Sequence, residues 1–157
     1  MNNDTVPAAE ALKKFRIIFA AVRQHFRAVE KACGVSGAQV WVLAALAGQS
    51  GMRVTELARQ LSIHQSTASN LLHKTEKAGL VKRTRSQKDQ RVVELDITDA
   101  GRAVLDKAPK PYTGLLPHTL NEMSEADLAG LNDSLNKVIG HMIHVDVTAA
   151  EQPLSEL

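Results

Sequence analysis

The chain has few aromatic residues, a single cysteine and no long apolar run. Only five of its 157 residues are Phe, Trp or Tyr, so a platform of rings that stacks single-stranded bases is not expected. No apolar stretch approaches the roughly 18 residues that a membrane-spanning helix needs. The lone Cys33 excludes an internal disulfide and suits a reducing cytosol. We therefore expect a folded protein without membrane or disulfide constraints.

Several sequence signals of other protein classes are also missing. The first residues, MNNDTVPAAEA, lack the basic and then apolar order of a signal peptide. There is no phosphate-cradling glycine loop, no nucleophile elbow and no pair of carboxylates in a plausible cleft. We therefore expect a cytoplasmic protein that is not an enzyme and needs no cofactor. A length of 157 residues with 44% hydrophobic content suits one well-buried core.

The net charge of +2 is unevenly distributed along the chain. Residues 74–91 contain seven Lys and Arg residues against two acids, whereas residues 103–157 contain three against eight. Concentrated positive charge is the electrostatic signature of a polyanionic partner. The basic cluster therefore indicates a nucleic-acid surface in the middle of the chain.

Two segments at opposite ends have apolar residues at alternating intervals of three and four. The first seam contains Leu12, Phe15, Phe19, Val22, Phe26, Val29 and Cys33, and the second contains Leu128, Leu131, Leu135, Val138, Met142 and Val145. Such seams bury against other helices, within a chain or between chains. We assign residues 7–33 and 109–147 to a helical dimerisation domain, in which Pro109, Pro111 and Pro117 interrupt the helices. Residues 148–157 are expected to form a frayed tail.

Residues 36–108 lack a long heptad pattern, and their short helical and strand-like segments predict a winged helix-turn-helix. We expect a helix over 39–47, a helix capped by Thr55, a turn over 62–64, a helix over 65–78 ended by Gly79, strands over 80–85 and 92–97, and a helix capped by Thr98. The last flanking helix should begin at Ser124. The fold class is thus mainly α with a small β-hairpin wing, flanked by N- and C-terminal dimerisation helices.

The helix over 65–78 carries the predicted function. Its inner face is apolar, and its outer face has short hydroxyl and amide groups that suit base edges and phosphates. The outer residues are Gln65, Ser66, Thr67, Ser69, Asn70, His73 and Lys74. A helix of this kind fits a major groove. We therefore predict double-stranded DNA as the partner.

The hairpin that follows adds a second predicted contact. Lys88 and Arg91 lie on its polar tip, close to Arg85. An arginine at such a tip can enter the narrow minor groove of A·T-rich DNA, where the negative potential is enhanced.

Part of the sequence resembles the MarR family of bacterial transcription regulators. The resemblance lies in residues 54–105, VTELARQLSIHQSTASNLLHKTEKAGLVKRTRSQKDQRVVELDITDAGRAVL. It comprises the helix-turn-helix, the EKAGLV exit, the Asp-x-Arg of the wing and the LxIT-x-x-G start of the next helix. It implies a homodimer on a palindromic operator, most often a repressor released by a small anionic, often phenolic, ligand, acting at the nucleoid in the cytoplasm.

The resemblance also assigns roles to individual residues. It implies that Ser66, Thr67, Ser69, Asn70 and Lys74 face the major groove and that Asp89 orients Arg91 for the minor groove. The chain departs from the family at Asn70, where arginine is common, and in the wing, which has one arginine where many members have two. The proline-rich stretch over 109–117 replaces a straight helix.

An effector site is expected between the dimerisation helices and the DNA-binding lobe. An aromatic acid needs a cation for its charge and an apolar or aromatic wall for its ring. The available combination is Arg16, Arg23 and His25 on the first helix with Trp41 on the next. The alternative is that Trp41 belongs to the core and both arginines are solvated.

Three other functions stay open at this point. His141, His144 and His118 could indicate a metal-responsive regulator, although no third ligand stands in helical register and exposed histidines without metal are expected. Cys33 could be a redox sensor, but it continues the apolar seam, which favours a buried thiol. A winged helix that binds protein instead of DNA would need an apolar or acidic third helix, and this one is neither.

Overall fold

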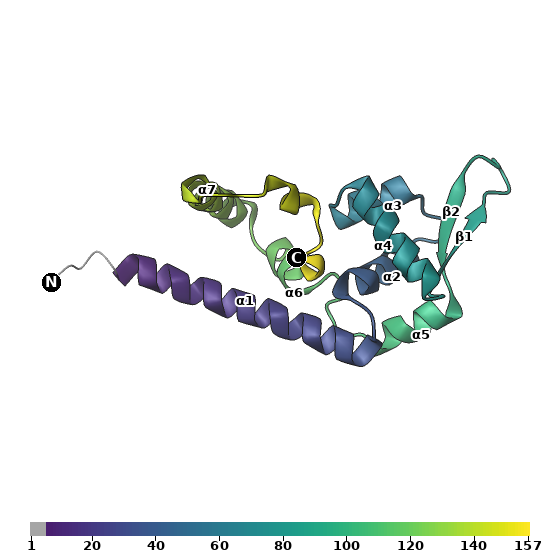
Figure 1. Ribbon diagram of the computed structural model, residues 1–157, viewed down its shortest axis with the longest axis horizontal. Helices are drawn as coiled ribbons and strands as arrows, with labels where there is room; N and C mark the ends of the chain where they lie inside the picture. Colours follow the sequence, from purple (N-terminus) through teal and green to yellow (C-terminus); the bar gives the residue numbers. More distant parts are fainter. Residues whose placement is uncertain (1–5) are drawn as a thin grey trace.

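The computed structural model describes residues 6–157 and divides them into a winged lobe and long flanking helices (Figure 1). The elements in chain order are α1 (Val6–Cys33), α2 (Gly37–Gly48), α3 (Val54–Leu61), α4 (Gln65–Lys77), β1 (Val81–Arg85), β2 (Val93–Ile97), α5 (Asp99–Lys107), α6 (Leu115–Asn121), α7 (Glu125–His141) and the 3-10 turns η2 (Val147–Glu151) and η3 (Leu154–Glu156). The predicted class, mainly α with one hairpin wing, is confirmed. No helix within residues 6–157 is long and apolar enough to cross a membrane.

The core lies in the winged lobe and is centred on α2. This helix contacts α1, α3, α4, α5, β2 and η3. Its Leu43 and Leu46 are fully buried together with Leu57, Leu72 and Leu95 from three other elements. Because a fully buried leucine contributes roughly 1.5–3 kcal/mol, this shared core fixes α4 and the hairpin on one rigid support.

Helix capping confirms the predicted starts of α5 and α7 and corrects those of α2 and α3. α2 begins two residues before Gln39, because Ser36 is its N-cap and the Ser36 hydroxyl accepts a hydrogen bond from Gln39 N at 3.3 Å. The side chains of Thr98 and Ser124 accept backbone amides of the first turn, as the sequence predicts.

The prediction that Thr55 caps α3 is wrong, because this helix begins two residues earlier than that cap implies, with Arg53 as the N-cap. The carboxylate of Glu56 accepts a hydrogen bond from the Arg53 amide at 2.8 Å. The acid three residues beyond the cap thus fixes the start, without a hydroxyl.

The hairpin is a two-stranded antiparallel sheet in which Val81 pairs with Ile97 and Arg85 with Val93. The segment before α3 forms an antiparallel bridge with β2. Leu95 N donates to Met52 O at 2.9 Å, and Gly51 N donates to Leu95 O at 3.1 Å. The base of the wing is therefore tied to the core, while its tip projects away from the lobe (Figure 1).

The prolines break the chain where the sequence predicts. α5 ends at Lys107, and α6 begins after Gly114, whose φ of 95° suits glycine. Pro117 is tolerated because it lies in the first turn of α6, where its missing amide hydrogen would have no helical partner. A short separate helix therefore replaces a continuous one.

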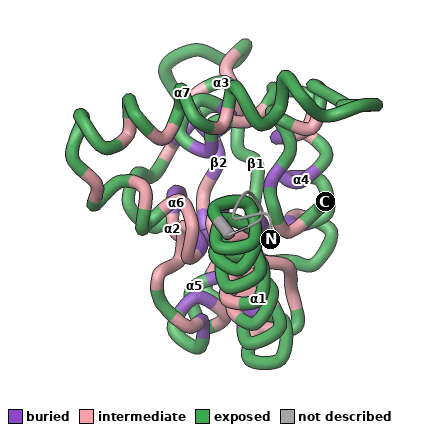
Figure 2. Tube along the Cα trace, turned by 90° about the vertical axis from the view of Figure 1, so that its left-hand side faces the viewer, coloured by how far each residue is buried: buried purple, intermediate pink, exposed green. Residues whose placement is uncertain are grey.

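The outer parts of α1 and α7 are exposed in the single chain, as the green tube of α1 shows (Figure 2). In α1 the seam is buried at Val29 but not at Leu12 or Phe19, which are 49% and 65% exposed. α7 has no buried residue. It also ends at His141, so the last two seam residues, Met142 and Val145, lie beyond the helix.

The last residues do not form the frayed tail that the sequence predicts. Asp146 caps the turn η2 by accepting the Thr148 amide, and η3 follows after the buried Pro153. Ser155 Oγ accepts a hydrogen bond from Ala38 N at 3.0 Å. The tail is folded because it finds polar partners on α2 and α4, far from it in the sequence.

Candidate nucleic-acid interface

α3 and α4 form the predicted helix-turn-helix. The turn between them contains Ser62 in the left-handed conformation, with φ of 54°. His64 then caps α4, because its Nδ1 accepts a hydrogen bond from Ser66 N at 3.2 Å. At the other end Gly79 has φ of 74° and Leu80 is buried, as the sequence predicts. The start and end of α4 are therefore fixed by local contacts.

The inner face of α4 holds the helix in place. Ala68, Leu71 and Leu72 are buried in the core. Thr75 is fully buried as well, and its hydroxyl donates to Leu71 O at 2.8 Å, so it leaves no polar atom unpaired. This packing turns the opposite face of α4 outward.

The outer face contains every residue of α4 that the sequence predicts to contact DNA. Thr67 and Ser69 are half-buried, and the others are exposed, namely Gln65, Ser66, Asn70, His73 and Lys74. Hydroxyl and amide groups of this kind can pair with base edges, and Lys74 can pair with a phosphate.

The tip of the hairpin presents positive charge on a structured loop. Arg85 Nη1 donates to Gln90 O at 3.0 Å across the tip, and Lys88 and Arg91 are exposed. Asp89 Oδ1 accepts a hydrogen bond from the main-chain N of Arg91 at 3.0 Å. Within residues 6–157 no ion pair joins the Asp89 carboxylate to the Arg91 guanidinium. Asp89 therefore shapes the backbone from which Arg91 projects.

An ion pair joins the hairpin to α4. Arg83 Nε lies 2.9 Å from Glu76 Oε2, with both side chains about one-third exposed. An exposed pair of this kind contributes roughly 0–1 kcal/mol. Its main effect is to withdraw Arg83 from the free positive charge of the wing, which leaves Arg85, Lys88 and Arg91 at the tip.

The folded tail lies against the same outer face of α4, a feature that the sequence analysis missed. Gln152 Nε2 donates to Thr67 Oγ1 at 3.4 Å, and Lys74 Nζ pairs with Glu156 Oε2 at 3.3 Å. Together they enclose a small cavity of about 240 Å³ between the tail and α4. One sequence signal could have indicated this contact. No Lys or Arg follows residue 137, so the charge of the tail complements the basic residues of α4 and the wing.

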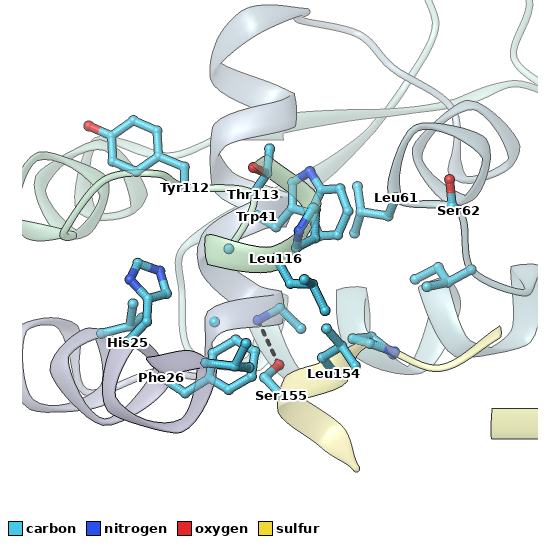
Figure 3. Close-up of a pocket in the computed structure, with 18 of the residues that line it drawn as sticks. His25, Phe26, Trp41, Leu61, Ser62, Tyr112, Thr113, Leu116, Leu154 and Ser155 are labelled. Carbon is cyan, nitrogen blue, oxygen red and sulfur yellow. Dashed lines mark hydrogen bonds between the residues drawn. The ribbon is translucent and has the colours of Figure 1, made fainter. Parts of the chain in front are cut away.

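A larger cavity of about 440 Å³ lies where α1, α2, α6 and the tail meet. His25, Phe26 and Trp41 line it with Leu116 and Leu154 (Figure 3). Of the four residues predicted to hold an effector, His25 and Trp41 both line this cavity. Arg16 and Arg23 are exposed on α1 and do not line the cavity. Among the lining residues only His25 can carry a positive charge.

The remaining candidates lie apart from both features. Burial raises the pKa of the Cys33 thiol, and the Lys107 ammonium partly offsets this effect. The thiol donates to Val104 O at 3.7 Å. His118, His141 and His144 are exposed, and residues 6–157 contain no group of three metal-ligating side chains.

Comparisons with known proteins give the same picture as the geometry. Residues 34–92 match the MarR family. The transcriptional repressor MdtR of Bacillus subtilis (strain 168) is 27% identical over 95 residues, covering 60% of this chain and 61% of MdtR. The regulator TtmR of Methylorubrum extorquens (strain PA1) is 32% identical over 107 residues, covering 65% of this chain and 55% of TtmR. The chain thus matches less than two thirds of the length of either relative.

A solved structure extends the likeness beyond the helix-turn-helix. A MarR family protein from Bacillus stearothermophilus superposes with a TM-score of 0.53 and 26% identity, over 90% of this chain and 98% of that one. The resemblance to the MarR family that residues 54–105 predict is confirmed by the family match over residues 34–92, by these regulators and by this structure.

Proposed function

We propose that this protein is a homodimeric, sequence-specific DNA-binding transcription regulator of the bacterial cytoplasm. The observation that carries the proposal is the exposed polar face of α4 beside the exposed cationic hairpin tip, both fixed on one buried core. A rigid support of this kind keeps the distance between a helix in the major groove and a wing in the minor groove constant.

The two elements have different tasks in this proposal. Asn70, in the middle of the exposed face of α4, reads a base edge, and Asn suits the paired donor and acceptor of adenine. Lys74 and Lys88 neutralise phosphates, which makes affinity depend on salt. Arg91 enters the minor groove from the tip that Asp89 shapes.

Dimerisation supplies the second half-site. The exposed apolar residues of α1 and α7 include Leu12, Phe19, Val138 and Ile139, each at least 40% exposed. A soluble monomer rarely leaves a long helical seam uncovered. We therefore assign these seams to contacts across a twofold axis, which matches a palindromic operator.

The larger cavity is the proposed effector site, and the protein is proposed to repress until an effector binds there. Its 440 Å³ falls within the usual range for small-molecule sites, and its wall combines Trp41 and Phe26 with aliphatic residues. Since both arginines lie outside, a neutral aromatic molecule suits the wall at least as well as an acid. His25 is then the partner for a hydroxyl or a carboxylate.

The DNA proposal is tested with duplexes of about 30 base pairs, long enough for two half-sites, enriched from a random pool by the wild-type chain. An inverted repeat should emerge. Asn70→Ala should change the preferred base at one position of each half-site by about 1–3 kcal/mol, measured by gel shift at fixed salt. Failure of the wild type and all variants to bind any duplex at low salt would favour the protein-binding alternative.

The effector proposal is tested through the single tryptophan. Salicylate and its neutral analogue salicylamide are titrated while Trp41 fluorescence is followed, with and without the selected duplex. We expect salicylamide to bind at least as tightly as salicylate, and ligand and DNA to weaken each other reciprocally. If neither compound changes the fluorescence below millimolar concentration, the cavity is not a site for such molecules.

A further inference from the structure

The C-terminal segment, residues 146–157, occupies the surface through which the protein would contact DNA. Gln152 Nε2 donates to the hydroxyl of Thr67, and Glu156 pairs with the ammonium of Lys74. The small cavity between segment and helix is also lined by Ser66 and Asn70. Four of the residues proposed to meet the major groove therefore face the chain's own end.

These contacts resemble the ones that DNA would make with the same residues of α4. A carboxylate of Glu156 on Lys74 takes the place of a phosphate oxygen, and the Gln152 amide offers a donor to Thr67, as a base edge can. The segment has three acidic residues and no Lys, Arg or His. It is therefore an acidic segment that lies on a polar helix face and pairs with Lys74, a cation of that face.

The segment is anchored outside the DNA surface as well. Ser155 Oγ accepts the Ala38 amide, and Glu151 O accepts the His64 amide at 3.3 Å. Pro153 is buried, whereas Glu156 is 29% exposed at its side chain. The contacts are few and largely polar, so the segment can be displaced at a modest cost.

Gln152 and Pro153 line both cavities, the small one on α4 and the larger one beside Trp41. A molecule in the larger cavity would therefore touch the same segment that covers α4. Leu154 and Ser155, which follow directly, also line the larger cavity (Figure 3).

We propose that the C-terminal segment is an intramolecular competitor of DNA for α4, an inference that rests on the proposed DNA-binding function. DNA binds only after the segment leaves Thr67 and Lys74. The apparent affinity for DNA is then the intrinsic affinity reduced by the fraction of molecules in which the helix is uncovered.

The test compares two charge reversals in the full-length chain. Glu156→Lys removes the ion pair with Lys74. Glu151→Lys is the control, because it makes the same change of charge in the same segment. Within residues 6–157 no hydrogen bond or ion pair joins the Glu151 side chain to α4. At one salt concentration Glu156→Lys should lower the Kd for the selected duplex about two- to fivefold more than Glu151→Lys, the range expected for loss of one exposed ion pair. Circular dichroism checks that both variants are folded.

Two further measurements do not depend on charge. Ser155→Ala removes the acceptor of the Ala38 amide and should also tighten DNA binding, whereas Ser134→Ala on α7 should not. Adding duplex to the wild type should raise hydrogen exchange of the amides at 147–157 while it slows exchange in α4.

The outcomes separate this inference from the function on which it rests. Equal Kd values for the two charge reversals, with unchanged or slower exchange in the tail on adding DNA, would overturn the competitor role and leave DNA binding intact. Binding by Glu156→Lys and not by the wild type would support it strongly. Absence of binding by every variant would overturn the proposed function itself.

Discussion

Gly101, near the start of α5, has no room for a side chain. A Cβ at this position would lie 2.2 Å from Leu80 O and 2.7 Å from a side-chain carbon of Ile97. Because Leu80 O also accepts the amide of Thr98, the cap of α5, the backbone there cannot shift freely. The glycine thus lets the wing's base and α5 pack directly on each other.

Gly101→Ala should therefore lower the free energy of unfolding by about 1–3 kcal/mol, the usual range for overpacking, measured by urea titration. Gly48→Ala is the control, since a Cβ there meets no atom within 4 Å. It should change stability by less than about 0.5 kcal/mol. Similar effects of the two substitutions would contradict the close packing at Gly101.

The residue scale also gives a prediction for Cys33. Because burial raises the pKa of its thiol, the reactive thiolate is scarcer at pH 8 than in a free cysteine. Alkylation by iodoacetamide should be slower in the folded than in the urea-unfolded protein. As the pH rises, the alkylation rate of the unfolded protein should level off first, while the rate of the folded protein still increases. Faster reaction in the folded state would instead support the redox alternative.

At the scale of elements, the wing and α4 are the two proposed contacts with DNA, and one core holds both. The Met52–Leu95 bridge ties the base of the hairpin to the core, while the tip stays outside the core. Loss of a side chain at the tip should therefore affect DNA binding with little effect on folding.

Arg91→Ala should weaken binding to the selected duplex about tenfold or more, as expected for a directly bound arginine, with an unchanged unfolding midpoint. The matched control is Arg102→Ala, which removes the same charge from an exposed position on α5. Gel-shift titration at fixed salt distinguishes them. If both variants bind equally well, the effect of Arg91 is general electrostatics and the assignment to the minor groove is wrong.

At the scale of the whole molecule, the winged lobe has a complete core and the long helices do not. Val29 of α1 is buried against the lobe, whereas Phe19, further out on the same seam, is 65% exposed. In the proposed dimer, a second copy of the chain covers the exposed half with its own equivalent surface.

Phe19→Glu should therefore produce a monomer at micromolar concentration by light scattering, because burying a carboxylate in an apolar interface is unfavourable. The monomer should also bind the palindromic duplex more weakly, since one half-site contact is lost. Gln24→Glu adds the same charge at an exposed polar position of α1 and should stay dimeric. Persistence of the dimer in Phe19→Glu would place the interface elsewhere.

The sequence by itself determined the parts of the protein whose structure depends on near neighbours. Gly79 at the end of α4 and the Thr98 and Ser124 caps act over three or four residues, so they were predictable. The start of α3 was missed, although Arg53 and Glu56 are equally close, because the acid rather than Thr55 forms the cap.

Only the tertiary structure decided where the cavity and the C-terminal segment lie. His25 and Trp41 line the larger cavity and Arg16 and Arg23 do not, because the faces of α1 and α2 that point inward depend on how the helices pack. The segment is held by contacts such as Gln152 with Thr67 and Ser155 with Ala38, 85 and 117 residues apart. A pattern over a few neighbouring residues cannot predict contacts between residues so far apart in the chain. Such contacts form only when the whole chain folds and closes the loops between them.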